Sequence, residues 1–294
     1  MAQTIKPTDT AHIAVLVAAY ARDIAKRRRQ TLVGLVILTI CFGVAGWAAE
    51  VRPTVLSEHI GNFGTYIAGL FVLDSGDWVW TSPAEWFWGL RKWSGQLADT
   101  ILMAYVGTLL GAMMGFVLCF FSCRNLVRSV WLRTIMRRFL EFGRTVPDIV
   151  FALIFVGAFG LGPVPGVLAL AMHTTGAMGK LYAEVVENID MKPVEGIASV
   201  GGTWLQQIRF AVLPQVQSNF ASYALLRFEI NVRSAGVLGF VGAGGIGTTL
   251  LVSIRKFYAS DVSAILIMLV VTVMLIDYGT EKLRYYLIGS EHRR

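Results

Sequence analysis

Long runs without a charged residue divide this sequence, and they limit the folds that it can adopt. They cover residues 30–49, 100–123, 149–179 and 234–254, and a further apolar stretch covers 258–277. A helix that crosses a lipid bilayer needs about 20 mostly apolar residues. A soluble globule with 55% hydrophobic and 15% charged residues would leave large apolar patches in water, and disorder needs the opposite composition. The sequence therefore predicts an all-α membrane protein.

The first run follows a basic cluster, Lys26-Arg27-Arg28-Arg29. A basic stretch before an apolar one is also typical of a secretory signal peptide. However, this run begins only at Gln30, is longer than the apolar region of a signal peptide and lacks a convincing small-x-small cleavage site. We therefore expect residues 30–49 to be a retained membrane anchor.

The run over 149–179 is too long for one membrane helix. As a single helix it would measure roughly 46 Å, whereas the hydrocarbon core of a bilayer is about 30 Å thick. Its middle reads G-L-G-P-V-P-G over residues 160–166, and Gly and Pro together break helices. We expect two spans, 145–161 and 164–180, joined by a tight turn.

The next two candidate segments are less regular. Residues 213–233 carry several polar and charged side chains, and residues 234–254 are uncharged but rich in glycine. The glycines that break the second segment are Gly242, Gly244, Gly245 and Gly247. Irregular backbone at membrane depth is tolerated only where protein or a water-filled cavity surrounds it. The simplest count is about six transmembrane helices, with 234–254 forming a broken or re-entrant segment.

Basic residues are distributed unevenly along the chain, whose net charge is +7. Six lie in residues 1–30, six arginines lie in 124–144 against one acid, and four lie in the tail after Asp277: Lys282, Arg284, Arg293 and Arg294. Residues 50–98 hold three basic and five acidic residues. Because Lys and Arg concentrate in cytoplasmic loops, we expect both termini in the cytoplasm and residues 50–98 outside. This distribution explains the positive charge without a nucleic-acid partner.

Two further segments have the composition of membrane interfaces. Five tryptophans lie in residues 77–93, and tryptophan concentrates where membrane meets water. We expect a hairpin or helix on the outer leaflet there, and a stacking platform for a ligand is the alternative. The arginines of 124–144 alternate with apolar residues, which favours an amphipathic helix on the inner leaflet. Contact with a cytosolic partner is the alternative for that helix.

The sequence contains no clear pattern of a metal site or a catalytic site. Cys119 and Cys123 are spaced i,i+4, but no His or carboxylate lies nearby in the sequence, so we interpret both as small buried hydrophobic residues. His173 has no second His or Cys at ligand spacing, and it lacks the carboxylate at helical spacing that an intramembrane enzyme would require. The nucleotide-binding sequence G-x-x-x-x-G-K-[S/T] does not occur. We expect no metal site and no catalytic residue.

Residues 181–212 form a polar segment between two candidate spans. Pro193 suits the first turn of a helix, Gly201-Gly202 can end that helix, and Thr203 suits the cap of a second one. Pro214 then opens the next span. A helix–glycine–helix unit on the cytoplasmic side is either a surface that docks into a partner or an ordinary connecting loop, and the pattern alone favours neither.

Part of this segment resembles the coupling motif of the permeases of ABC importers. That motif reads E-A-A, three residues, G, nine residues, an aliphatic position, one residue, L-P. The same spacing is kept here by Glu195, Gly196, Ile197, Gly201, Leu213 and Pro214. The sequence departs from the motif where Gly196 and Ile197 replace two alanines and where Ala211 stands at the aliphatic position. Gly196 weakens the helix by about 1 kcal/mol relative to alanine.

Three stretches make the resemblance narrower: residues 143–163, 166–184 and 227–247. The most specific is R-F-E-I-N-V-R followed by V-G-A-G-G-I-G in the third stretch. Together they are similar to the permease subunit of phosphonate importers. The resemblance covers about 99–277 and implies a core, 99–294, with the type I ABC importer permease fold and the cytoplasmic coupling helix. Residues 1–98 match only weakly, and we expect them to form an N-terminal part with a cytoplasmic segment, the anchor helix and the Trp-rich outer segment.

The resemblance implies a multi-pass protein of the bacterial cytoplasmic membrane that forms the path for phosphonates or related phosphorus oxyanions by alternating access. Its implied partners are a second copy of itself, two cytosolic ATPase subunits that bind ATP and Mg²⁺, and a periplasmic or lipid-anchored substrate-binding protein. The chain itself would hold no cofactor. A related permease for an amino acid, phosphite or a quaternary amine is the alternative, although the core spans show no aromatic cage for an amine. A passive channel would lack the coupling segment.

Charged residues in a membrane span are costly and suggest function by default. Arg227, Glu229, Asn231 and Arg233 lie in or beside one span. On a helix Glu229 and Arg233 are i,i+4 partners, which leaves Arg227 to attract an anion through its guanidinium fork. We therefore expect these four residues to line the substrate path or its gate. The alternative is structural, in which ion pairs lock the broken segment or a seam between two copies.

A second polar patch, His173-Thr174-Thr175, lies within the predicted span 164–180. Thr and His side chains form hydrogen bonds across helices in membranes, so we expect contacts between helices, with lining of the transport path as the alternative. Glu184 and Glu187 follow on the cytoplasmic side, where we expect solvent or the ATPase to contact them.

Overall fold

The computed structural model describes residues 7–50 and 53–289. Arg293 and Arg294 of the basic tail therefore lie outside the described residues. The described chain is almost entirely helical, with one isolated β-bridge between Val72 and Trp78. Its elements are α1 (Pro7–Ala48), α2 (Pro53–Gly69), α3 (Pro83–Trp86), α4 (Leu90–Ser122), α5 (Val130–Thr145), α6 (Asp148–Phe159), α7 (Pro163–Glu187), α8 (Lys192–Ser199), α9 (Trp204–Gln207), a π-helical turn (Ile208–Val212), α10 (Leu213–Leu238), a 3₁₀ turn (Gly239–Val241), α11 (Ile246–Arg255) and α12 (Ala259–Gly289).

The chain divides into two compact units between Tyr66 and Ile67. In the first unit, α1 has 42 residues. At about 1.5 Å per residue it is about 63 Å long, roughly twice the thickness of a bilayer core. Its candidate span is Ala14–Ala48, within which one 18-residue window has a mean hydropathy of 2.1. The predicted anchor is thus helical and long enough to cross a membrane.

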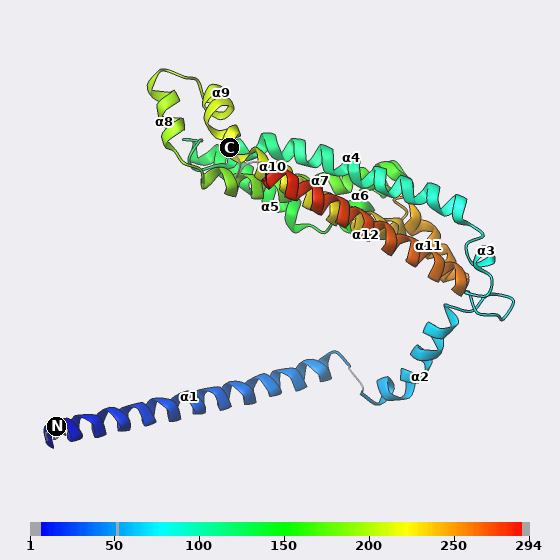
Figure 1. The fold of residues 1–294 in the computed structure, drawn as a ribbon, viewed down its shortest axis with the longest axis horizontal. Helices are drawn as coiled ribbons and strands as arrows, with labels where there is room; N and C mark the ends of the chain where they lie inside the picture. The colour runs from blue at the N-terminus through cyan, green and yellow to red at the C-terminus, as the bar shows by residue number, and fades with distance from the viewer. Residues whose placement is uncertain (1–6, 51–52, 290–294) are drawn as a thin grey trace. The chain divides into compact units, whose positions relative to one another are not determined.

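In the second unit α7 is the central helix, and α4, α5, α6 and α10 all pack against it (Figure 1). Three glycines of α4 face α7, one per helical turn. A Cβ atom on Gly107, Gly111 or Gly115 would lie 2.7, 2.5 or 2.9 Å from the nearest atom of α7. Small residues that let two backbones approach closely are typical of helix contacts in membranes.

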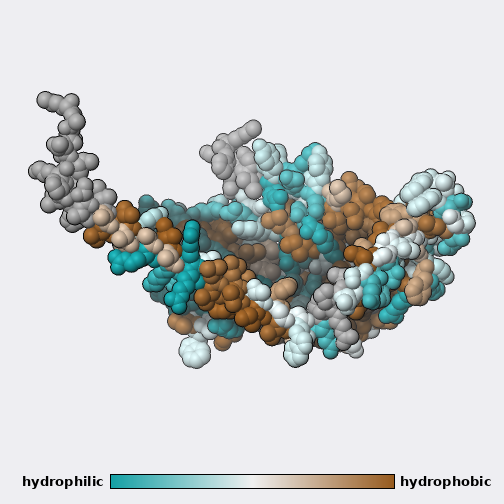
Figure 2. All heavy atoms as spheres, turned by 90° about the horizontal axis from the view of Figure 1, so that it is seen from below, coloured by the Kyte–Doolittle hydropathy of each residue, from teal (hydrophilic) through white to brown (hydrophobic). Residues whose placement is uncertain are grey.

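Large apolar areas are exposed on the surface, as the brown areas in Figure 2 show, and many exposed apolar side chains lie on the long helices. Among them are Leu102, Val117, Ile154, Val270 and Leu275, all more than half exposed. An apolar surface of this extent is unusual for a protein surface that faces water. These faces are therefore suited to contact lipid or another membrane subunit.

Three helical segments are long and apolar enough to cross a membrane: Ala14–Ala48, Leu90–Ser122 and Ala259–Tyr286. Two bent pairs qualify if each is counted as one span: Val130–Thr145 with Asp148–Phe159, and Trp204–Val241 with Ile246–Arg255. Helix α7 has 25 residues, but its His, Thr and Lys side chains lower its hydropathy. Because other helices surround it, α7 does not need the apolar surface of a lipid-facing span. Five such spans and α7 agree with the predicted count of about six.

The predicted span 145–161 contains the single helix α6, which is too short to cross a bilayer alone. Helix α6 has 12 residues, about 18 Å at 1.5 Å per residue, and it meets α5 at 90°. The cause is Pro147, which lacks a backbone N–H and forces the preceding Val146 into an extended conformation. The predicted turn after α6 is confirmed, since Gly160 and Gly162 adopt positive φ angles of 83° and 144°.

The predicted break in 234–254 is also confirmed. Helix α10 ends in a 3₁₀ turn, and Gly242, Gly244 and Gly245 then adopt positive φ angles before α11 begins. The break packs against the turn between α6 and α7, where the Gly162 N–H donates to the Gly242 carbonyl at 3.0 Å. Gly247 has a different role from the one predicted, because it lies in the first turn of α11. A Cβ atom there would lie 2.0 Å from the Gly236 carbonyl oxygen.

The Trp-rich segment forms a tight turn, closed by the Val72–Trp78 bridge, and then the short helix α3. Trp78 and Trp80 stack with ring centroids 4.8 Å apart. Trp86 Nε1 donates to Ser263 Oγ at 3.0 Å, and Trp88 Nε1 donates to Asp261 Oδ1 at 2.8 Å. These bonds attach the segment to the first turn of α12. Its place on the outer leaflet stays a prediction.

Candidate functional site

The coupling segment has the helix–glycine–helix form that the sequence predicts. Helix α8 ends at Ser199, and Gly201 turns the chain with a φ of 82°. The Gly202 N–H donates back to the Ile197 carbonyl at 2.9 Å, which closes the turn. The Thr203 N–H donates to the Gln206 side chain at 2.7 Å at the start of α9. In Figure 1 α8 and α9 project together from one end of the bundle.

The motif residues divide between surface and core. Glu195 and Gly196 are exposed on α8, whereas Ile197 and Leu213 pack against the cluster of buried residues below them. Pro214 is the second residue of α10, which continues directly from the π-helical turn Ile208–Val212 before it. The segment also exposes apolar Val200 and Leu205, at 85% and 68%. It therefore presents a small apolar surface that is rigidly held from below.

Two residues that hold the coupling segment were not identified from the sequence. Val194 is buried beneath α8. Trp204 donates its Nε1–H to the Leu126 carbonyl at 3.2 Å and packs on Phe121 at the end of α4. A tryptophan within an otherwise polar stretch was the signal that could have indicated such an anchor.

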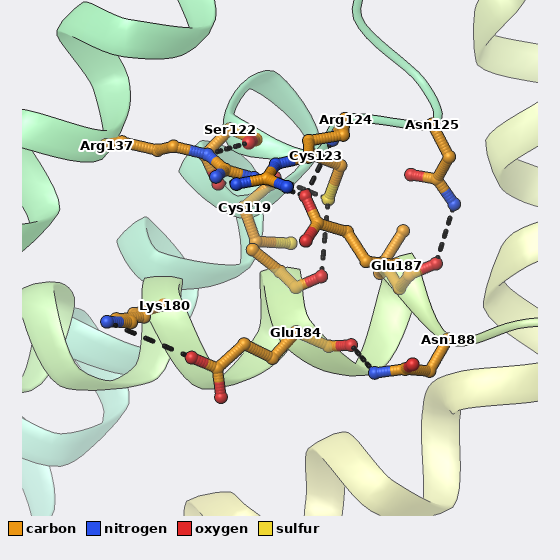
Figure 3. A network of polar contacts seen from close by, with 12 residues as sticks. Cys119, Ser122, Cys123, Arg124, Asn125, Arg137, Lys180, Glu184, Glu187 and Asn188 are labelled. Atoms are coloured by element: carbon orange, nitrogen blue, oxygen red, sulfur yellow. Dashed lines mark hydrogen bonds and ion pairs between the residues drawn. The ribbon is translucent and has the colours of Figure 1, made fainter.

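A polar network joins the base of the coupling segment to the bundle (Figure 3). Glu187, at the end of α7, forms an ion pair with Arg137 of α5 and accepts the Arg124 N–H at 2.7 Å. Asn125 donates to the Val186 carbonyl at 2.8 Å and to Met191, the residue before α8, at 3.5 Å. The Glu187 carboxylate is thus bound within the chain and 25% exposed, and its contact with solvent or an ATPase stays a prediction.

Glu184, one turn earlier, differs from Glu187. Its carboxylate lies 3.9 Å from Lys180 Nζ, and its side chain is 56% exposed. It is therefore free to contact solvent or a partner, as predicted.

A second cluster lies in the middle of the bundle and centres on Arg227 of α10. Arg227 Nη2 donates to His173 Nδ1 at 2.7 Å, and Arg227 Nε donates to Thr174 Oγ1 at 3.4 Å. Asn231, one turn further along α10, donates to Thr174 Oγ1 and to Thr108 Oγ1, both at 2.8 Å. The cluster thus connects α4, α7 and α10. Thr108 was not among the predicted residues, because nothing in the sequence marks it.

Three other predicted residues lie outside this cluster. Glu229 and Arg233 do not pair with each other. Arg233 instead forms two bonds, 3.0 and 2.9 Å, to the Asp277 carboxylate on α12, and Glu229 accepts the hydroxyl of Thr280 on the same helix. Thr175 is buried and donates to the Ala171 carbonyl of its own helix at 2.8 Å. Glu229 and Arg233 therefore join α10 to α12, and Thr175 bonds within α7. Of the two predicted arginines, only Arg233 binds a carboxylate.

Cys119 and Cys123 are buried as predicted, and their thiols donate to backbone carbonyls of α4. Over residues 7–50 and 53–289, no group of three His, Cys, Asp or Glu side chains is arranged to hold a metal ion.

Comparison with known proteins agrees with this architecture. Residues 107–287 match the family described as "binding-protein-dependent transport system inner membrane component". A phosphite transport system permease protein of Stutzerimonas stutzeri is 40% identical over 198 residues, which cover 67% of this chain and 72% of that protein. A putative cryptic phosphonate transport system permease protein of Escherichia coli is 50% identical over 121 residues, covering 41% of this chain and 99% of that protein.

A solved structure of a methionine ABC transporter in inward-facing conformations superposes with a TM-score of 0.58 at 19% identity. The match covers 70% of this chain and 98% of that one. At this identity the likeness concerns the fold, which is that of the type I ABC importer permeases. The family match spans more than half of the sequence, and these permeases are transport subunits rather than enzymes. This chain therefore belongs to the family of inner membrane components of binding-protein-dependent transport systems.

Proposed function

We propose that this chain forms the translocation path for phosphonates or related small phosphorus oxyanions, such as phosphite, in an ATP-driven importer. The observation that carries the proposal is the name of its relatives, since one is a phosphite permease and another a phosphonate permease. The match to the phosphite permease covers two thirds of this chain. An arginine in the bundle whose contacts are all neutral agrees with an anionic solute.

The coupling segment suggests how ATP hydrolysis reaches the path. Helices α8 and α9 expose apolar side chains but are fixed to α4 and α7 by Trp204 and Val194. A rigid unit of this kind transmits the movement of a docked partner to the helices that it contacts. We assign the docking partner as a cytosolic ATPase subunit that binds ATP and Mg²⁺, and this chain holds neither.

Orientation and assembly follow from the same proposal. The basic residues of α5 and the coupling segment belong on the cytoplasmic side of the inner membrane, as do both termini. The opposite face receives solute from a periplasmic or lipid-anchored binding protein.

Two permease chains enclose the path, and we assign the second as a copy of this chain. Co-purification of two differently tagged copies supports that assignment, and recovery of a different permease chain contradicts it.

The substrate is tested by uptake in bacterial cells that lack their own phosphonate and phosphite importers. The chain is expressed with its ATPase and binding protein, and entry of radiolabelled methylphosphonate is measured. We expect uptake that excess unlabelled phosphite or methylphosphonate suppresses and that excess methionine or glycine betaine leaves unchanged. Uptake of methionine or glycine betaine in place of the phosphorus compounds would contradict the proposal.

A further inference from the structure

Arg227 differs from three other cations of the bundle in the charge of its partners. Arg233 pairs with Asp277, Arg137 with Glu187, and Lys180 with Glu184. No carboxylate in the described part of the chain forms an ion pair with Arg227. Asp148, at the start of α6, acts on Arg227 through space but is not paired with it. A cation at membrane depth without an ion-pair partner is costly, so an anion that reached Arg227 would be stabilised there.

The groups that contact Arg227 are all neutral, and their protonation is determined by the geometry. An arginine only donates hydrogen bonds, so His173 Nδ1 accepts from Arg227 and carries no proton. His173 Nε2 lies 3.2 Å from the Arg144 carbonyl, which only accepts, so the ring proton is on Nε2. His173 is therefore a neutral acceptor that holds the guanidinium without cancelling its charge.

Buried side chains fix the other contact. Thr174 and Asn231 are fully buried, and Asn231 donates to both Thr174 and Thr108. Thr174 Oγ1 is thereby held where it accepts from Arg227 Nε. The Asn231 Oδ1 atom is buried and has no hydrogen-bond partner among the described residues. Among the described residues, Arg227 is thus held by neutral groups only.

The remaining donors of Arg227 suit a tetrahedral oxyanion. A guanidinium has five N–H groups, and Arg227 uses one on Nε and one on Nη2. The N–H groups that remain on Nη1 and Nη2 have the fork geometry that binds two oxygens of one phosphorus oxyanion. Arg227 and His173 are only partly buried, whereas Thr174 and Asn231 lie behind them, so the fork is at the edge of the packed core.

We infer that Arg227, held by His173, Thr174 and Asn231, is a transient binding site for the phosphorus oxyanion inside the permease. The inference rests on the proposed function, because the bound anion is the transported solute. The site neutralises the solute charge at membrane depth while the path is occupied. It releases the anion readily because His173 and Thr174 remain as neutral partners of the guanidinium.

Binding is tested directly on the purified permease–ATPase complex without its binding protein. The probe is methylphosphonate, and the readout is broadening of its ³¹P resonance. We expect broadening by the wild-type complex, its loss in Arg227→Gln, and a weaker effect in Arg227→Lys, which keeps the charge but lacks the fork. Arg128→Gln is the matched control, since Arg128 is an exposed arginine of the loop before α5. Equal broadening by wild type and Arg227→Gln would overturn the inference.

A second readout separates a binding role from a structural one. In proteoliposomes with loaded binding protein, methylphosphonate uptake per ATP hydrolysed should fall at least about tenfold in Arg227→Gln, as expected for the loss of a charge-assisted contact to the solute. A purely structural role would lower uptake and ATP hydrolysis together, and that result would also overturn the inference. A folded wild-type complex that imports neither methylphosphonate nor phosphite would instead refute the proposed function.

Discussion

Glu187 joins three segments that are far apart in the sequence. It binds the Arg137 side chain of α5 and the backbone N–H of Arg124, and its own helix leads into the coupling segment. The two charged side chains are 29% and 25% exposed, so they are better shielded from water than the usual surface pair. The Glu187 carboxylate therefore connects α7 to α5 and to the chain just after α4.

Replacing Glu187 by glutamine should therefore destabilise the protein. The amide cannot neutralise Arg137, and we expect a loss of about 1–2 kcal/mol in the free energy of unfolding, between the values for exposed and fully buried pairs. The measurement is the melting temperature of the purified protein in detergent. Glu184→Gln is the control, because Glu184 is 56% exposed and 3.9 Å from its partner. A shift of equal size in both variants would contradict the assigned role.

At the scale of residues, the sequence identified the important positions better than it identified their partners. Arg227, Asn231, His173 and Thr174 were selected because polar groups in a span are costly, and the structure brings them together. The predicted Glu229–Arg233 pair is not formed. An i,i+4 pair contributes only about 0.2–0.5 kcal/mol, which a two-bond contact with a carboxylate on another helix outweighs. Spacing along one helix cannot reveal a partner 44 residues away.

At the scale of elements, the coupling segment depends on one glycine more than on another. Gly201 has a φ of 82°, a conformation that side chains with a Cβ rarely adopt. Gly196 lies within α8, and a Cβ atom added there would have open space around it, with nothing within 4 Å. The two glycines stand five residues apart in the same surface unit. They therefore form a matched pair for testing the turn.

Gly201→Val should distort the turn between α8 and α9 at a cost of about 1–3 kcal/mol. Because the exposed surface of the unit would be displaced, we expect ATP-driven uptake to fall about tenfold, as such a cost implies. Gly196→Ala should retain uptake and gain up to about 1 kcal/mol of helix stability. Uptake and ATPase activity are measured in reconstituted complexes at equal permease content. Full uptake in Gly201→Val would refute the docking role of this turn.

Turns whose sequence contains helix-breaking glycines were predicted correctly. Glycines with positive φ mark the turn after α6, the turn after α8 and the break before α11, and all three were expected from the sequence. The 90° bend between α5 and α6 was not expected. Pro147 stands just before the apolar run 149–179, between the predicted amphipathic segment 124–144 and that run. Hydropathy separates the two segments but does not give the angle between them. The short α6 packs on α7 and α10.

At the scale of the whole molecule, composition indicates a membrane protein. Tertiary packing explains why α7 is less hydrophobic than the other candidate spans. Helix α7 carries the polar patch at His173 and Thr174 and also Lys180. It tolerates them because α4, α5, α6 and α10 surround it. A solute path requires polar groups at membrane depth, and a central helix is where the fold can hold them without exposing them to lipid.

The central claim is that this chain, with its partners, moves a phosphorus oxyanion across the membrane at the expense of ATP. The most direct measurement is accumulation of radiolabelled methylphosphonate in proteoliposomes that contain the permease–ATPase complex. ATP is enclosed on the side of α8 and α9, and loaded binding protein is added on the other side. We predict accumulation above the external concentration that requires both ATP and binding protein. Equilibration without ATP, or ATP hydrolysis without any uptake of methylphosphonate or phosphite, would contradict the account.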